Sequence, residues 1–487
     1  MNLCNINHSF NYELEKLCRI FLPYEKISVI NEIIEDEIYA VCKTEDRTCF
    51  SYLNFFGKEF KETLISPDDT DKEKELTLAT TLFQCFVKAT GYKSEWGLLT
   101  GVRPAKLFSR LVKNFGVEKA EEYFKGRLLV SDEKTSLCKT TSLSEEIIIE
   151  NNSRNSFSLY VSIPFCPSRC SYCSFVSHSV DKAGKLIDEY VELLCEEIKE
   201  TGKVASKENL KLETVYIGGG TPVAISAIQI TKIMDSIRAN FDLTNVSEYT
   251  VEAGRPDAID KDKLIAIKNG GATRISVNPQ TMNDKVLKEI GRNHTSQQTI
   301  EAFKLARDVG FNSINMDLIA GLPTDTLDSF KQTLNTLLEL DPESITVHSL
   351  SVKRASNISR ENMLPQFETG KVASQMVQYA RNTLSGKGIV PYYMYRQSKT
   401  VGNLENVGYA KNGFEGLYNV YIMDETHTIL ACGASAVTKL REPGGDYIER
   451  IYNFKYPYEY ISRFGELIER KKGIVEFYKK YPVETEQ

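Results

Sequence analysis

The sequence predicts an α/β protein built around a parallel βα array, and three observations support this. Between Leu159 and Leu350, short apolar strand-like runs alternate six times with amphipathic helical segments, as in parallel sheets covered by helices. Glycines and polar residues recur where these runs end, which is where parallel α/β folds place their sites. The chain of 487 residues is also long enough for two or three domains.

We therefore expect an N-terminal α+β accessory domain over residues 1–155, a six-unit βα core over 156–355 and an irregular α/β region over 356–487. In the first region, strand-like runs occupy 27–34, 38–43 and 49–56, and a helix-like segment follows at 75–92. The polar stretch 150–156 is typical of a linker.

The core elements follow from periodicity. The expected strands are 159–164, 214–219, 248–253, 273–278, 313–319 and 344–350, and the helices between them are 182–202, 225–240, 260–269, 297–309 and 325–340. Connections between parallel strands are right-handed, so all the carboxyl ends meet at one edge. The array is either open or closed into a barrel.

The composition and charge of the chain argue against some classes of function. Sixty basic and sixty-six acidic residues give a net charge of -6, which argues against binding nucleic acid through bulk charge. We see no apolar run of the ~20 residues that a membrane span needs. The first residues lack the basic end and apolar stretch of a secretory signal, so we expect a cytoplasmic protein. A monomer is a separate expectation, which no sequence feature fixes.

Cysteines fall into two groups. Eight of the eleven are scattered in mostly apolar surroundings and are expected to pack as core residues. The other three, Cys166, Cys170 and Cys173, lie in one loop directly after the first strand of the array. Soft thiolates at this spacing favour an iron–sulfur cluster with one open iron; a zinc site closed by His178, or inert thiols, are the alternatives.

Three consecutive glycines follow the second strand of the array. Residues Gly218, Gly219 and Gly220 precede Thr221 and allow the backbone to approach a ligand closely. A tight turn before a helix explains them equally well.

These motifs together resemble those of the radical S-adenosylmethionine superfamily. The resemblance rests on the cysteine loop, on GGGTP and on the Glu-x-x-x-Pro spacing from Glu252 to Pro256. Within the superfamily, the segments 274–281, 291–295 and 315–326 resemble motifs of the oxygen-independent coproporphyrinogen III oxidase family. The segment WGLLTGVRPAKL and the later NLENVGYAK further resemble the HemZ-type coproporphyrinogen dehydrogenase branch.

The resemblance implies a partial (βα)6 barrel holding a [4Fe–4S] cluster and S-adenosylmethionine, with the C-terminal region covering the substrate. Cys166, Cys170 and Cys173 would ligate the cluster. The implied S-adenosylmethionine contacts, which include those to a second molecule, are Tyr160, Tyr172, Gly219, Gly220, Thr221, Glu252, Gln280, Arg292, Asp317 and His348.

Each polar contact also has a structural alternative. Strand-end side chains such as Glu252 and Asp317 often cap helices or pair with a neighbouring charge. Tyr392, Tyr393, Tyr395 and Arg396 could line a tetrapyrrole pocket, in which the arginine pairs with propionates, or could simply pack in the core.

One position departs from the resemblance. Well-characterised oxidases of the family carry a fourth cysteine where this chain has Phe175, an ending that instead resembles the haem chaperone branch. The HNxxYW segment of that branch is also missing, because the only tryptophan is Trp96 and the nearest equivalent is Leu417-Tyr418-Asn419.

Three functions therefore remain open. The first is oxidative decarboxylation of coproporphyrinogen III to protoporphyrinogen IX, with a flavodoxin or ferredoxin-type electron donor. The second is haem binding or transfer without turnover of coproporphyrinogen. The third is another radical reaction on a tetrapyrrole, such as anaerobic haem methylation and ring opening.

Overall fold

The computed structural model describes residues 1–150, 152–175, 177–351 and 366–483, and its internal contacts divide the chain into two compact units. Unit 1 comprises Met1–Ser142, the described part of Leu364–Lys371, and Tyr395–Glu405. Unit 2 comprises the rest. The expected boundary near residue 355 lies outside the described residues, and the domain limits drawn from the sequence stay predictions.

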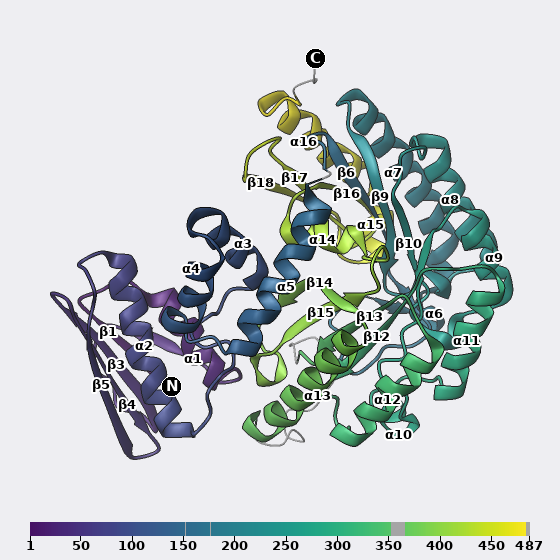
Figure 1. The fold of residues 1–487 in the computed structure, drawn as a ribbon. Coiled ribbons are helices and arrows are strands. Elements are labelled where there is room, and N and C mark those ends of the chain that lie inside the picture. Colours follow the sequence, from purple (N-terminus) through teal and green to yellow (C-terminus); the bar gives the residue numbers. More distant parts are fainter. Residues whose placement is uncertain (151, 176, 352–365, 484–487) are drawn as a thin grey trace. The chain divides into compact units, whose positions relative to one another are not determined.

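Unit 1 contains a five-stranded sheet in the order β2-β1-β3-β4-β5. In Figure 1 the helices α1 and α2 lie along one face of this sheet. Helix α2 begins where the Thr70 side chain accepts a hydrogen bond from the Glu73 backbone, and it ends at Gly91 with a φ of 68°. The bounds are β1 Asn2–Ile6, α1 Asn11–Phe21, β2 Ser28–Ile30, β3 Ile38–Glu45, β4 Thr48–Phe55, β5 Lys58–Ile65, α2 Asp71–Thr90, α3 Pro104–Phe115, α4 Val117–Glu122 and α5 Asp132–Ile149, the last of which continues into unit 2.

The expected strand over 27–34 is wrong in its second half, because β2 ends at Ile30. Residues 31–37 contain four acidic side chains, and Ile33 and Ile34 are 58% and 53% exposed. Because these two isoleucines are not buried against a core, they do not stabilise a strand at this position.

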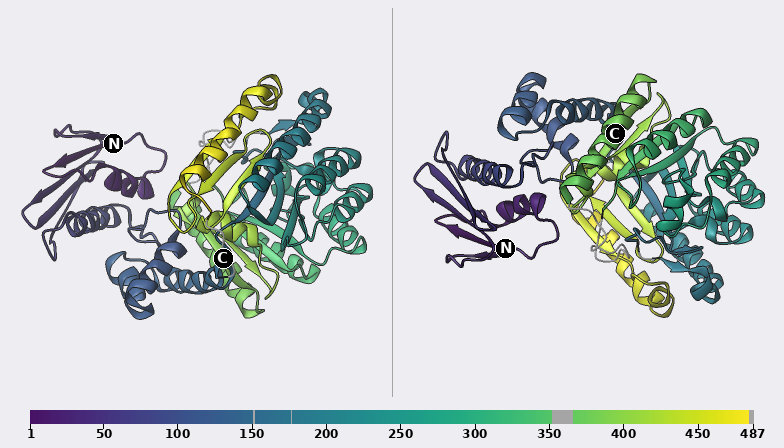
Figure 2. Two further views of the ribbon diagram at one scale, coloured as in Figure 1. Left: turned by 90° about the horizontal axis from the view of Figure 1, so that it is seen from above. Right: turned by 90° about the horizontal axis from the view of Figure 1, so that it is seen from below.

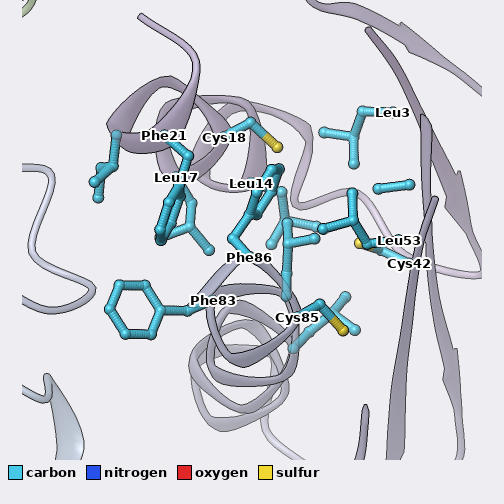
Figure 3. Close-up of a cluster of buried hydrophobic side chains, with 14 of the residues drawn as sticks. Leu3, Leu14, Leu17, Cys18, Phe21, Cys42, Leu53, Phe83, Cys85 and Phe86 are labelled. Carbon is cyan, nitrogen blue, oxygen red and sulfur yellow. The ribbon is translucent and has the colours of Figure 1, made fainter. Parts of the chain in front are cut away.

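Scattered cysteines form part of the core of unit 1. Figure 3 shows the side chains of Cys18, Cys42 and Cys85 among leucine and phenylalanine side chains of α1, α2 and the sheet. Burial raises the pKa of the Cys42 thiol to about 12, although Ser51 opposes the shift. These thiols therefore stay protonated and pack as small apolar groups, as their surroundings predict.

A buried polar cluster holds the segment Tyr395–Glu405 within unit 1. The Trp96 indole N–H donates to Glu405 at 2.8 Å, and the Lys134 ammonium donates to the other carboxylate oxygen of Glu405 at 2.6 Å. Arg396 lies over the Trp96 ring and donates to the carbonyl oxygens of Leu99 and Asn403.

Unit 2 is organised around an eleven-stranded sheet in the order β14-β15-β13-β12-β11-β10-β9-β6-β16-β17-β18. The six expected strands are present as parallel neighbours in sequence order, from β6 to β13. Over the described residues the sheet has two edges, β14 and β18, so it is an open array rather than a closed barrel. The bounds are β6 Ser156–Ile163, β9 Lys211–Gly219, β10 Glu248–Glu252, β11 Arg274–Ser276, β12 Ile314–Ala320 and β13 Ser344–Ser349.

Helices between these strands lie side by side along the outer face of the sheet (Figures 1 and 2). Four of these helices start at side-chain caps, which are the reciprocal capping boxes at Ser226 and Thr295 and the single caps at Asp260 and Thr326. The bounds are α6 Val180–Ala183, α7 Ile187–Lys207, α8 Ala227–Asn240, α9 Lys261–Asn269, α10 Asp284–Glu289, α11 Ser296–Asp308 and α12 Leu327–Leu340. None of the helices in the described ranges has the length and apolar character needed to cross a bilayer.

The C-terminal region extends the same sheet at both edges. Strand β16 pairs in parallel with β6, and β15 pairs antiparallel with β13. A buried carboxylate, Glu197 of α7, accepts hydrogen bonds from Tyr460, Asn453, Gly433 and Lys471. The bounds are α13 Gln366–Gly386, β14 Val390–Arg396, β15 Glu405–Ala410, α14 Leu417–Asp424, β16 Thr428–Cys432, β17 Val437–Arg441, β18 Ile448–Tyr452, α15 Pro457–Ser462 and α16 Phe464–Lys480.

Candidate functional site

The cysteine loop leaves β6 at the carboxyl edge of the parallel strands. It is closed by a short parallel pair, β7 (Phe165–Cys166) with β8 (His178–Ser179). Within it, the Cys173 backbone donates to the Cys170 carbonyl at 3.2 Å. Cys166 and Cys170 are buried, and Cys173 is partly exposed. One loop therefore presents all three thiols.

The thiols are close enough to influence one another. Burial raises the pKa of Cys173, and the neighbouring Cys170 and Cys166 raise it further. Among the described residues, however, no three His, Cys, Asp or Glu side chains have the geometry of a metal site. His178 packs edge-on against the rings of Tyr456 and Tyr458, and its Nε2 has no hydrogen-bond partner among the described residues.

The glycine turn packs directly against the first cysteine. A Cβ added to Gly220 would lie 3.0 Å from the Cys166 sulfur and 2.7 Å from the Phe165 carbonyl oxygen. Gly219 has a φ of 109°, which an L side chain rarely adopts. The Thr221 hydroxyl donates to the Cys166 sulfur at 3.4 Å. The close approach of these two segments requires the glycines.

Glu252 ends β10 beside the same turn. Its carboxylate accepts a hydrogen bond from the Tyr216 hydroxyl at 2.5 Å. A Cβ on Gly218 would meet the Tyr216 ring at 2.8 Å and the Glu252 carboxyl carbon at 3.1 Å, so the first glycine makes room for this pair. Burial raises the pKa of Glu252 to about 7, while Tyr216 holds it lower than burial alone would.

Three tyrosines form a stack next to Glu252. The rings of Tyr160 and Tyr216 are nearly parallel with centroids 6.2 Å apart, and Tyr418 of α14 lies 4.5 Å from Tyr216. Tyr160 and Tyr216 are half-buried, whereas Tyr418 is buried. The stack provides a flat aromatic surface beside the carboxyl edge.

Asp317 and His348 lie on the neighbouring strands β12 and β13. The Asp317 carboxylate accepts from the Asn315 amide at 2.7 Å and lies 3.7 Å from His348 Nε2. Burial alone would raise the pKa of Asp317, but His348 and Asn315 hold it below its ordinary value. Gln280 adopts a left-handed φ of 67°, and its backbone N–H donates to the Asp317 carbonyl at 2.9 Å.

Arg292 connects the cysteine loop to the end of β10. Its guanidinium donates to the Tyr172 hydroxyl at 3.2 Å and to the Gly254 carbonyl at 2.8 Å. Burial raises the pKa of Tyr172, although Arg292 opposes this shift. The phenol therefore stays protonated.

Buried polar atoms with no hydrogen-bond partner gather in the same region. In the described part of the chain they include Ser276 Oγ, Asn278 Oδ1, Gln280 Oε1, Arg292 Nε and both ring nitrogens of His294. Burial, aided by Arg292, lowers the pKa of His294 to about 3, so the ring is neutral. Because such atoms are costly when they stay unpaired, their concentration here indicates the place of a polar ligand.

The expected site residues thus gather at one edge of unit 2, while the tyrosine-rich segment does not join them as a pocket. Tyr393 packs against Gly408, and Tyr392 is completely buried near Gly416. The Arg396 guanidinium is engaged by backbone carbonyls in unit 1. The packing interpretation therefore holds for these three residues.

Sequence reasoning missed several members of the site. Tyr216 lies in an expected strand, and Ser276, Asn278 and His294 lie in motif segments, but nothing local marked them as facing the same region as Glu252. The first three lie in or just after adjacent parallel strands, whereas His294 lies between α10 and α11. Strand register was a signal for the first three only.

The open βα array with a cysteine loop after its first strand defines a radical SAM domain, and the family model of the Radical SAM superfamily matches residues 160–337. The oxygen-independent coproporphyrinogen-III oxidase-like protein HemZ of Bacillus subtilis is 36% identical over 422 residues, covering 85% of this chain and 84% of HemZ. The chain belongs to the family of oxygen-independent coproporphyrinogen III oxidase-like proteins.

Two further relatives mark the breadth of this family. The heme chaperone HemW of Bacillus subtilis is 32% identical over 311 residues, which cover 62% of this chain and 77% of HemW. Coproporphyrinogen III oxidase (HemN) from Escherichia coli, a radical SAM enzyme, has the same fold with a TM-score of 0.51 at 23% identity, covering 67% of this chain and 72% of HemN. The cofactors are the [4Fe–4S] cluster and S-adenosylmethionine of this superfamily.

The residues present fit these cofactors. Three thiols on one loop supply the soft ligands that iron–sulfur clusters require. The glycine turn brings its backbone close to the Cys166 sulfur, and the unpaired polar atoms of Gln280 and Arg292 can hydrogen-bond a charged, polar ligand.

Proposed function

We propose that the protein catalyses the oxygen-independent oxidative decarboxylation of coproporphyrinogen III to protoporphyrinogen IX in porphyrin biosynthesis. The observation that carries this proposal is the similarity to HemZ, which extends over 85% of the chain, beyond the radical SAM core alone. The geometry of the carboxyl edge supports a radical reaction there.

The cysteines are the proposed cluster ligands. Cys166, Cys170 and Cys173 would bind three irons and leave the fourth to S-adenosylmethionine. The contact of Thr221 with Cys166 and the close approach of Gly220 support a methionine-binding turn beside the cluster, together with Gly219. Replacing Cys170 with alanine should abolish bound iron and visible absorbance and leave the far-ultraviolet circular dichroism unchanged.

Glu252 is the proposed ribose ligand, since a carboxylate has enough acceptor sites for both ribose hydroxyls. Tyr160 and Tyr172 are the proposed neighbours of the cofactor. Gln280, Arg292, Asp317 and His348 are the proposed contacts to a further S-adenosylmethionine. The unpaired atoms of Gln280 and Arg292 support that role.

The cofactors, when bound, would supply radical chemistry capable of hydrogen abstraction. The proposed overall reaction removes hydrogen from a propionate β-carbon with loss of carbon dioxide and one electron. The chain's own residues hold the substrate carbon in place and exclude water. A one-electron donor of the flavodoxin or ferredoxin type is the proposed partner, an electron acceptor is also required, and we place the protein in the cytoplasm.

Haem binding is the second candidate function, and Phe175 favours it. This side chain occupies the position of the fourth cysteine and is 67% exposed beside the cysteine loop. The similarity to HemW chaperones points the same way.

An anaerobic assay with S-adenosylmethionine, dithionite and coproporphyrinogen III separates the two candidates. Loss of two carbon dioxide units per tetrapyrrole together with 5′-deoxyadenosine formation supports the decarboxylase. Stable haem binding without any change in tetrapyrrole mass supports the chaperone. The Phe175→Cys variant, which restores the fourth cysteine, tests whether that position limits turnover.

A further inference from the structure

Arg255 contacts the cysteine loop from the segment that follows β10. Two residues separate it from the end of β10, and its side chain is 4% exposed. The Asp257 carboxylate fixes the orientation of the guanidinium. It accepts hydrogen bonds from Nε at 2.9 Å and from Nη2 at 2.7 Å. A buried arginine held in this way keeps its charge and its orientation.

The opposite side of the guanidinium faces the cysteine loop. Nη1 donates to the Ser168 carbonyl at 3.1 Å and to the Cys170 sulfur at 3.6 Å, and Nη2 also donates to the Ser168 hydroxyl at 3.0 Å. Ser168 lies midway between Cys166 and Cys170. Arg255 therefore fixes the backbone between two cysteines and directs an N–H at the sulfur of one of them.

Two charged groups lie near this contact. The Asp257 carboxylate pairs with the Nε–Nη2 edge of Arg255 and offsets part of its positive charge, while Nη1 remains directed at the Cys170 sulfur. Arg292 is a further cation, bound to Tyr172 and Gly254, and His294 is neutral. The N–H donation from Arg255 to the Cys170 sulfur is therefore retained beside a partly offset positive charge.

We propose that Arg255 is a positioning residue that raises the reduction potential of the cluster by donating to the Cys170 sulfur and placing a positive charge beside it. This inference rests on the ligand role of Cys170 given under the proposed function. In the redox step, one electron from dithionite or a donor protein converts [4Fe–4S]²⁺ to [4Fe–4S]⁺, and no bond breaks and no proton moves. A donor and a cation next to a ligand sulfur stabilise the reduced state, which is more negative.

The test is an anaerobic redox titration of the full-length reconstituted protein, followed by the electron paramagnetic resonance signal of the reduced cluster. Arg255→Met should shift the midpoint potential to a more negative value, and Arg255→Lys, which keeps the charge, should shift it less. Arg307→Met is the control, because Arg307 pairs with Glu343 near the amino end of β13 and should leave the potential unchanged.

A second variant should shift the midpoint potential in the opposite direction. Asp257→Asn removes the counter-charge but keeps Arg255, so the midpoint potential should become more positive. It also keeps the inference testable if Arg255→Met fails to bind iron. If the wild type and these variants have equal midpoint potentials at equal iron content, the proposed role of Arg255 is wrong. The ligand assignment of Cys170 is not affected by that result. Iron retained by Cys170→Ala would instead remove the ligand assignment on which the inference rests.

Discussion

Tyr216 donates a hydrogen bond of 2.5 Å to Glu252 across the parallel strands β9 and β10. The pair lies above Gly218, where any side chain would collide with it. A glycine usually attributed to a turn therefore also makes space for a carboxylate. Two measurable consequences follow from the raised pKa of this carboxylate, one for stability and one for ligand binding.

Glu252→Gln should stabilise the protein at high pH. Because the pKa of Glu252 is raised from 4.5 to about 7 by burial, the folded chain binds this proton more tightly than the unfolded chain does. The wild type therefore loses stability as the pH rises from 4.5 to about 7. We expect the variant to be more stable at pH ~8 by on the order of 1–3 kcal/mol, and the difference to shrink at pH ~5.

Thermal melts of the cluster-free protein at both pH values measure this difference. Glu289→Gln, at the exposed end of α10, is the control for a lost surface charge. A stabilisation of the same size at both pH values would contradict a raised pKa at Glu252.

Tyr216→Phe should move the pH dependence of S-adenosylmethionine binding. If the carboxylate of Glu252 accepts from ribose, affinity falls as the pH drops through about 7, where Glu252 becomes protonated. Tyr216 lowers the pKa of Glu252, so removing its hydroxyl shifts the midpoint to higher pH. Anaerobic equilibrium dialysis measures this midpoint. Tyr249→Phe, which removes a buried hydroxyl with no partner among the described residues, should leave it in place.

Substitutions of Gln280 can separate backbone strain from ligand contact. Both Gln280→Gly and Gln280→Ala remove the amide, so each should lower the affinity for S-adenosylmethionine by about tenfold, the value of one hydrogen bond. Only alanine keeps the cost of the left-handed φ of 67°, so it should be less stable than glycine by about 1 kcal/mol. Equal melting temperatures of the two variants would contradict backbone strain at position 280.

Lys134→Met should destabilise unit 1, because it leaves the buried carboxylate of Glu405 without its cation. A loss of about 3–5 kcal/mol is expected for breaking one side of a buried pair. Urea unfolding followed by fluorescence reports it well, since the only tryptophan, Trp96, contacts Glu405. The double variant with Glu405→Gln should recover much of the loss, and no recovery would show that the charge of Glu405 is not the cause.

Periodicity predicted most of the core of unit 2. Every expected strand from β6 to β13 is present, because short buried runs between amphipathic helices have few other folded solutions. Strand β16 was missed, although its apolar run Thr428–Cys432 is followed by a glycine, as β12 is. It pairs with β6, which lies about 270 residues earlier in the chain, and local patterns do not indicate such a distant partner.

The site was predictable as a set of motifs but not as a set of contacts. Cys170 was predicted as a ligand from its residue type and spacing, and Glu252 was predicted as a contact from the resemblance of its motif to that of the family. Arg255 was not found, because an arginine after a strand is ordinarily a solvated charge. Only the folded chain brings it to Ser168 and Cys170.

The most direct test of the proposed function is isotope transfer from coproporphyrinogen III deuterated at the propionate β-carbons. The reconstituted protein would be incubated anaerobically with S-adenosylmethionine and dithionite, and 5′-deoxyadenosine and the tetrapyrrole would be analysed by mass spectrometry. We expect deuterium in the 5′-deoxyadenosine, together with the loss of carbon dioxide from the tetrapyrrole. Unlabelled 5′-deoxyadenosine and a tetrapyrrole of unchanged mass would contradict hydrogen abstraction from this substrate.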